Sequence, residues 1–166
     1  MNQRLLQIGC SSLLLVVIGL STVAQAGTEL SCSYRATWKG TDKQKGSFSW
    51  KGFWFQGDGG WIFRANGDDK AGKSKIEGAC GDGNCDFRQT YVSGKLKGQH
   101  YYYQAKYTGE LPVGPKDLRL KGGWTKNQDK PNADGTWEAF PACKPSKVEG
   151  DDIPKALGWK GWDDNE

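Results

Sequence analysis

Residues 30–39 read LSCSYRATWK, and this stretch decides the fold class. Its apolar side chains all fall on one face of an extended chain: Leu30, Cys32, Tyr34, Ala36 and Trp38. Polar residues fill the positions between them, and this repeat of two is typical of a β-strand with one buried face. The same alternation recurs around Phe87 and around Leu120. The chain is therefore expected to consist of half-buried strands.

Clusters of Gly, Asp, Asn and Lys separate further aromatic-rich segments and indicate turns. Eight strands are expected, at 30–39, 46–55, 60–65, 73–80, 85–93, 99–109, 116–125 and 135–142. No segment before residue 144 combines a helical apolar period with a capping residue. Short links between eight strands favour an all-β, antiparallel up-and-down meander, with a closed barrel favoured over a sandwich.

The N-terminus has the pattern of a secretory signal peptide. Arg4 supplies the positive charge, Leu13 to Leu20 the apolar segment, and Ala24-Gln25-Ala26 the cleavage site. The apolar segment is shorter than the roughly 20 residues that span a bilayer. We expect a signal peptide at 1–26, a β-barrel domain at 27–143, and a charged, flexible tail at 144–166. The tail has room for one short helix near residues 154–157. The mature protein is expected to be periplasmic or extracellular, with no membrane span.

Removal of Cys10 with the signal peptide leaves four cysteines: Cys32, Cys80, Cys85 and Cys143. In an exported chain an even number predicts two disulfides, and four cysteines allow three pairings. The first strand of an eight-stranded meander begins at the end of the barrel where the last strand finishes. Cys32 and Cys143 are therefore expected to bridge the closing seam, and Cys80 and Cys85 to close the hairpin turn that they flank.

Aromatic residues dominate the candidate core, because all 8 Trp, 6 Tyr and 6 Phe follow Gly27 while aliphatic residues are few. Each ring buries more apolar area than Leu or Val. The candidates to line a ligand cavity are Trp38, Trp50, Trp54, Tyr102, Trp124 and Trp137. The alternative is that the rings simply fill the barrel, and small eight-stranded barrels do either.

The formal net charge is +4, from 23 Lys and Arg against 19 Asp and Glu, and it becomes +3 when Arg4 is removed. This modest charge argues against nucleic acid as the partner. The links at 40–46, 66–73, 93–98 and 126–135 lie at the end away from the cysteines and carry eight lysines against five aspartates. The opposite links hold only acidic charges: Asp58, Asp82 and Glu110. An anionic ligand or acidic-surfaced protein is therefore expected at the basic end, near Lys43, Lys70, Lys95 and Lys130.

No catalytic or metal-binding constellation is evident, so neither a metal nor another cofactor is expected. His100 is the only histidine, no Gly-x-Ser-x-Gly elbow is present, and the cysteines form no C-x-x-C pair. The Asp-Gly and Asn-Gly turns do not have the spacing of a calcium loop. A hydrolase with paired carboxylates remains an alternative, with the candidates Asp58, Glu77, Asp86, Asp117 and Glu138.

Consecutive Tyr101, Tyr102 and Tyr103 place tyrosine on both faces of one expected strand. Exposed rings beside polar groups suit contacts with a sugar or a protein. A second functional hypothesis is therefore a secreted inhibitor or toxin-like factor that acts through its loops and exposed tyrosines.

Three short motifs, Trp38-Lys39-Gly40, Gly122-Gly123-Trp124 and Gly135-Thr136-Trp137, accompany the strand pattern. Over about residues 30–142 the chain resembles small secreted eight-stranded barrels of avidin and lipocalin architecture. The resemblance implies a binding module without specifying its ligand. The preferred hypothesis is an exported, non-catalytic binding protein with an aromatic-rich interior and a basic open end.

Overall fold

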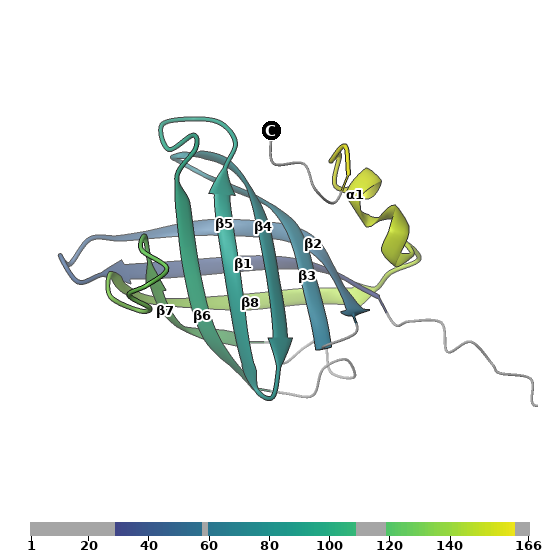
Figure 1. Cartoon of the computed structure of the whole chain (residues 1–166), viewed down its shortest axis with the longest axis horizontal. Coiled ribbons are helices and arrows are strands. Elements are labelled where there is room, and N and C mark those ends of the chain that lie inside the picture. Colours follow the sequence, from purple (N-terminus) through teal and green to yellow (C-terminus); the bar gives the residue numbers. More distant parts are fainter. Residues whose placement is uncertain (1–28, 58–59, 109–118, 162–166) are drawn as a thin grey trace, which may run out of the picture.

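A computed structural model describes residues 29–57, 60–108 and 119–161. Eight antiparallel strands follow one another around a closed barrel (Figure 1). They are β1 (Leu30–Gly40), β2 (Lys45–Gly57), β3 (Gly60–Asp69), β4 (Gly72–Gly81), β5 (Asn84–Tyr91), β6 (His100–Thr108), β7 (Arg119–Thr125) and β8 (Gly135–Pro145). A 3-10 turn, η1 (Gly150–Asp152), and a short helix, α1 (Ile153–Ala156), follow. The expected all-β meander and its closure are confirmed, while the expected signal peptide lies outside the described residues.

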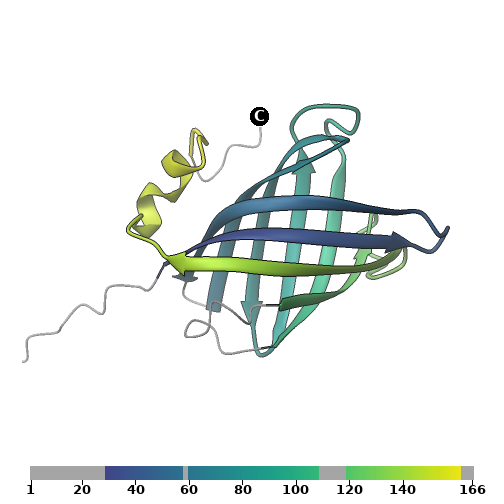
Figure 2. The same cartoon turned by 180° about the vertical axis from the view of Figure 1, so that it is seen from behind.

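Closure occurs between β1 and β8, which lie side by side in Figure 2 and pair from Leu30 opposite Pro145 to Gly40 opposite Gly135. Cys32 and Cys143 are direct partners in this register and form a disulfide. Cys80 and Cys85 are partners in the β4–β5 hairpin and form the second disulfide. Both expected pairings are therefore confirmed, and two disulfides suit an oxidising compartment.

The third strand is longer than expected, because β3 continues to Asp69, which pairs with Gly72 of β4. The sequence Asn66-Gly67-Asp68-Asp69 suggests a turn, yet the turn itself is Lys70-Ala71. The Asp69 Oδ1 atom accepts hydrogen bonds from the backbone N–H groups of Ala71 and Gly72, at 2.7 and 3.2 Å. The side chain thus stabilises a tight turn one step later along the chain.

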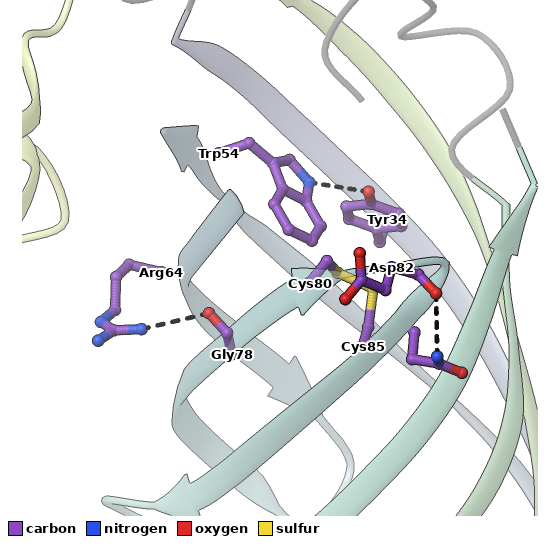
Figure 3. The surroundings of a disulfide bond; sticks show 8 residues. Tyr34, Trp54, Arg64, Gly78, Cys80, Asp82 and Cys85 are labelled. Carbon is purple, nitrogen blue, oxygen red and sulfur yellow. Dashed lines mark hydrogen bonds between the residues drawn. A yellow bond between two sulfur atoms is a disulfide. The ribbon is translucent and has the colours of Figure 1, made fainter. Parts of the chain in front are cut away.

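The two ends of the barrel differ in what crosses them. The disulfide end contains the start of β1 and the β4–β5 turn, and Figure 3 draws the Cys80–Cys85 bond there with the Trp54–Tyr34 hydrogen bond. The open end is formed by the links 41–44, 70–71, 92–99 and 126–134. No disulfide crosses the open end among the described residues, so these links surround a mouth that covalent bonds do not close.

Aromatic rings fill the interior of the barrel from the disulfide end to its middle. The Trp50 and Trp54 side chains are 0 % exposed. Trp50 contacts Phe63, Phe87, Tyr103 and Trp137, with ring centroids 5.4 to 6.2 Å apart. Tilted and edge-to-face contacts of this kind stabilise beyond the area that they bury. The filled-interior alternative therefore holds for this part of the barrel.

Residues 146–161 form a C-terminal arm that lies outside the barrel, where both views place α1 (Figures 1 and 2). The short helix expected near residues 154–157 is present as α1. Trp159 donates from Nε1 to Oδ1 of Asn66 on β3 at 2.7 Å, and the Asn66 amide donates to the Leu157 carbonyl at 2.8 Å. These contacts fasten the arm to the outer wall. No helix among the described residues is long and apolar enough to cross a membrane.

Candidate functional site

A cavity of about 410 Å³ opens at the mouth of the barrel. Its lining residues come from β1, β2, β3, β5, β6 and β7 and from the links of the open end, and they include aromatic rings, lysines and aspartates. The rings are Trp38, Phe48, Tyr91, Tyr101, Tyr103 and Trp124, and the charged residues are Asp42, Lys45, Asp69, Lys70 and Lys126. This volume lies in the range of small-molecule sites.

Four of these rings form a continuous aromatic belt along one side of the mouth. Trp38 meets Trp124 edge-on at 5.6 Å, Trp124 meets Tyr101 at 5.9 Å, and Tyr101 meets Tyr91 at 5.7 Å. The belt runs from β1 past β7 and β6 to the end of β5. Alternation along each strand turns these side chains inward, and their mutual contacts hold the surface rigid.

Tyr103 and Phe48 form the floor of the cavity, and a buried row of hydrogen bonds holds Tyr103 in place. The Tyr103 hydroxyl donates to Oε1 of Gln89 at 2.7 Å, and Nε2 of Gln89 donates to the Ser74 hydroxyl at 2.8 Å. Phe48 packs against Tyr103 with ring centroids 5.6 Å apart. Because the polar groups satisfy one another across three strands, the floor is fixed without a ligand.

The Asp69 side chain joins Tyr91 of the aromatic belt to the β3–β4 turn at the rim of the mouth. Its Oδ2 atom accepts a hydrogen bond from the Tyr91 hydroxyl, while Oδ1 receives the two turn N–H groups described above. Burial, this hydrogen bond and the negative charge of Asp69 raise the pKa of Tyr91 well above that of an ordinary tyrosine. Burial and the charges of Asp69 and Asp134 also raise the pKa of Tyr101. Both phenols are therefore neutral donors at physiological pH.

Two glycines let the loops of the mouth approach each other closely. Gly72 has a φ of +147°, and a Cβ there would lie 2.0 Å from the Ser93 carbonyl oxygen. Gly94 has a φ of +83°, and a Cβ there would lie 2.2 Å from the Ala71 carbonyl oxygen. That carbonyl accepts a hydrogen bond from the Lys95 N–H group at 2.8 Å. The β3–β4 turn and the β5–β6 link are thus joined into one rim.

The lysines that line the mouth are available to a ligand. Lys45, Lys70 and Lys126 are exposed, and none of them forms an ion pair within the described part of the chain. The Lys126 ammonium lies 5.8 Å from the centroid of the Tyr101 ring. Both aspartates of the lining accept hydrogen bonds from backbone N–H groups. Asp69 accepts them from Ala71 and Gly72, and Oδ1 of Asp42 accepts one from Gln44 at 3.0 Å.

The structure divides the sequence-based candidates into three groups. Trp38, Trp124 and Lys70 line the mouth cavity. Trp50, Trp54 and Trp137 belong to the filled interior below it. Lys43, Lys95 and Lys130 lie on links of the open end but are not among the cavity-lining residues.

Tyr102 is placed differently from the other aromatic candidates. Tyr103, its neighbour on β6, is buried in the core, so Tyr102 projects to the outer face. Tyr102 therefore lies apart from the inward tryptophans with which it is grouped in the sequence analysis. Three consecutive tyrosines give no contrast between apolar and polar positions, so the pattern does not fix which of them point inward.

Several residues of the mouth were not selected from the sequence: Lys45, Asp69, Tyr91, Tyr101 and Lys126. A usable signal exists for Tyr91, which shares the inward face of its strand with Phe87 and Gln89. Asp69 carries no such signal, because it lies where β3 ends. Lys45 and Lys126 lie in the links 40–46 and 126–135 that the sequence assigns to the basic end, but nothing there distinguishes them from the other lysines.

Of the carboxylates considered for a hydrolase, Glu77 and Asp86 line one hollow on the outer wall, whereas Glu138 lies on β8. Glu77 pairs with Arg88 and Arg64, and Glu138 pairs with Arg119 at 3.0 Å. Asp58 and Asp117 lie outside the described residues, as does Glu110 of the expected acidic end. No group of three or more potential metal ligands occurs in the described ranges.

A second, shallower hollow of about 690 Å³ lies on the outer wall over β3 to β6. Tyr102, Arg88, Gln104 and Glu77 contribute to it, together with Gln128 from the β7–β8 link.

Comparison of the chain with family models, with curated proteins and with solved structures finds no match.

Proposed function

We propose that this protein is an exported, non-catalytic binding protein that holds one small anionic ligand in the mouth of its barrel. The observation that carries the proposal is the ring-lined cavity of about 410 Å³ at the lysine-rich end. Elsewhere the described interior is packed with aromatic side chains. A ligand would therefore enter from the open end and stop at Tyr103 and Phe48.

The lining has the composition of a small-molecule site. It combines rigid apolar surface with a few positioned polar groups, which is the usual division between affinity and orientation. The belt of rings supplies the apolar surface, and the exposed lysines supply charge at the rim. The disulfides stabilise one end of the barrel, and the links at the opposite, open end supply residues that would contact a ligand.

The neighbouring residues Tyr101 and Tyr102 provide a matched test, since one lines the cavity and the other projects outward. Native mass spectrometry of protein purified from its source should show a co-purifying small mass. Titration with phenylnaphthylamine, a neutral fluorescent probe, should show binding to the wild type. We expect Tyr101→Ala to weaken probe binding roughly tenfold or more, because a ring in contact with the ligand is removed. Tyr102→Ala should leave it unchanged.

Absence of both a co-purifying mass and probe binding would contradict the proposal. So would equal weakening by the two substitutions, because the outer residue would then matter as much as the inner one. Circular dichroism of each variant should match the wild type, so that a lost fold is not mistaken for a lost site.

A second candidate function is protein interaction through the outer wall. The hollow over β3 to β6 favours it, because Tyr102, Arg88 and Gln104 combine an aromatic ring with donors and acceptors. Tyrosine and arginine are enriched in the energetic centres of protein interfaces. Under this function Tyr102→Ala, and not Tyr101→Ala, would abolish capture of the partner by immobilised protein.

A further inference from the structure

We infer that the ligand of the mouth is a planar aromatic anion, with its ring against the aromatic belt and its acidic group beside Lys126. This inference rests on the proposed function and specifies the chemical class that the site would bind. It is carried by three separate features of the mouth: the belt, the excess of lysines over aspartates in the lining, and the position of Lys126.

The belt favours a flat ring over an aliphatic chain. Trp38, Trp124, Tyr101 and Tyr91 follow one another in contact and present ring faces and edges from four strands. An aromatic ligand gains offset-stacked or edge contacts on such a surface, in addition to the area that it buries. Leu96 is the one residue among Leu, Ile, Val and Met in the lining, so the surface offers an aliphatic ligand few matching contacts.

The charges of the mouth favour an anion over a cation. A ring of aromatic residues can also hold a cation, and Asp69 and Asp42 would then be its partners. Both aspartates, however, already accept hydrogen bonds from the turns that they stabilise. The three lining lysines have no ion-pair partner within the residues that the structure describes. These hydrogen bonds hold the two aspartates in the turns without removing their charge, so the lining, with three lysines against two aspartates, has a net charge of +1.

Lys126 is the lysine best placed to contact an acidic group on a ring-bound ligand. Its ammonium lies over Tyr101, 5.8 Å from the ring centroid, so it is adjacent to the belt. Its backbone N–H group donates to Oδ2 of Asp134 at 2.7 Å, and the Thr125 hydroxyl donates to the same oxygen at 3.2 Å. These bonds fix the start of the β7–β8 link. Lys70, by contrast, occupies the tip of the two-residue β3–β4 turn.

Three naphthalene probes separate charge from fit: naphthoate (anionic) and naphthamide (neutral), which are nearly identical in shape, and the bulkier naphthyltrimethylammonium (cationic). Binding to the full mature protein is followed by quenching of tryptophan fluorescence, at low salt. We expect naphthoate to bind roughly five- to tenfold more tightly than naphthamide, because several partly exposed lysines each contribute a modest attraction. The cation should bind most weakly.

Lys126→Gln should weaken naphthoate binding roughly three- to fivefold and leave naphthamide binding unchanged. Lys106→Gln is the matched control, since Lys106 is exposed on β6, is absent from the mouth lining and carries the same charge. It should change neither affinity. Lys126→Arg should retain the preference for naphthoate.

Equal affinities of naphthoate and naphthamide for the wild type would overturn the inference while leaving the proposed function intact. So would equal effects of Lys126→Gln and Lys106→Gln, because the attraction would then come from overall charge. Preferential binding of the cation would overturn it in favour of an aromatic cage completed by Asp69. Failure of all three probes together with phenylnaphthylamine would overturn both the inference and the proposed function.

Discussion

Tyrosine hydroxyl groups connect the aromatic interior to its few buried polar atoms. The Tyr34 hydroxyl accepts a hydrogen bond from the Trp54 indole N–H at 2.9 Å, as Figure 3 shows. Tyr103 donates to Gln89, and Tyr91 donates to Asp69. Each bond satisfies a polar group that burial would otherwise penalise. A core made of tyrosine and tryptophan is therefore stable only while these phenols keep their protons.

This dependence predicts a loss of stability at alkaline pH. Burial is the main cause that raises the pKa of Tyr34, Tyr91, Tyr101 and Tyr103 in the folded protein. In the unfolded chain a tyrosine ionises near pH 10 or so. Above about pH 10 the unfolded state thus releases protons that the folded state retains, and stability falls as pH rises.

Urea unfolding at a series of pH values should show a constant midpoint up to about pH 9.5 and a steady decline beyond about pH 10.5. Tyr103→Phe should make the decline shallower, although it costs stability at neutral pH by removing the hydrogen bond that Oε1 of Gln89 accepts. A midpoint that does not change up to about pH 11.5 would contradict the assignment of buried, neutral phenols.

Among the paired elements of the barrel, β1 and β8 are the two neighbouring strands that lie farthest apart in the sequence. The disulfide between them joins residues 111 positions apart, whereas the hairpin disulfide joins residues 5 apart. In the chain-entropy model a cross-link stabilises more when it closes a longer loop. The seam bond is therefore expected to be the more important one, although both lie at the same end of the barrel.

Replacing both members of each pair by serine tests this expectation. Cys32→Ser with Cys143→Ser should reduce the free energy of unfolding by about 4 to 5 kcal/mol, and Cys80→Ser with Cys85→Ser by about 2 kcal/mol. Denaturant unfolding under matched conditions measures both. A larger loss in the hairpin variant would show that strain or residual structure in the unfolded state outweighs loop length.

The strands were largely predictable because one face of each strand is buried and alternation marks that face. The sequence did not determine the structure at two places. One is where neighbouring residues are chemically alike, so that alternation does not mark the buried face. The other is where the turn between two strands lies further along the chain than the sequence suggests. Tyr101, Tyr102 and Tyr103 are chemically alike, so the pairing of β6 with β5 and β7 decides that Tyr101 and Tyr103 point inward and Tyr102 outward. Asp69 ends β3, and its carboxylate caps the following turn through N–H groups two and three residues later. The sequence did not fix this position because Asn66-Gly67, in the same stretch, is a competing turn signal.

At the scale of the whole molecule, the C-terminal arm adds a second layer over one wall of the barrel. Ile153, Pro154 and Trp159 are buried in it. The Trp159 indole N–H donates to Oδ1 of Asn66, and the Asn66 amide donates to the Leu157 carbonyl. The Lys75 ammonium lies 5.0 Å from the centroid of the Trp159 ring. Asn66 and Lys75 are direct partners on β3 and β4. The arm thus braces the hairpin whose turn supplies Asp69 and Lys70 to the mouth.

Trp159→Ala should therefore destabilise the protein by about 1 to 3 kcal/mol, because a large buried ring and a hydrogen bond are lost. Asn66→Ala should cost about as much, and the double variant should cost less than the sum of the two single losses. Thermal unfolding measures all three. Lys155→Ala, at an exposed position on the arm, is the control and should have little effect. Additive losses would show that Trp159 and Asn66 do not act together.

The charge of the open end acts over a longer range than the contacts of the cavity. Lys43, Lys70, Lys95 and Lys130 lie on four separate links around the mouth and are all exposed. A ring of like charges around an opening attracts an oppositely charged ligand or an acidic protein surface during approach. Screening limits this attraction to about 8 Å at physiological salt. The effect should therefore appear in the association rate at low salt.

Replacing these four lysines by glutamine together should slow association of an anionic ligand roughly tenfold at low salt and have little effect at high salt. Stopped-flow fluorescence with naphthoate measures the rate, and naphthamide, which has no charge to be steered, is the control. Three of the four lysines do not line the cavity, so the dissociation rate should change less than the association rate. An unchanged association rate at low salt would mean that these lysines serve solubility, and that charge acts at this mouth only through direct contact.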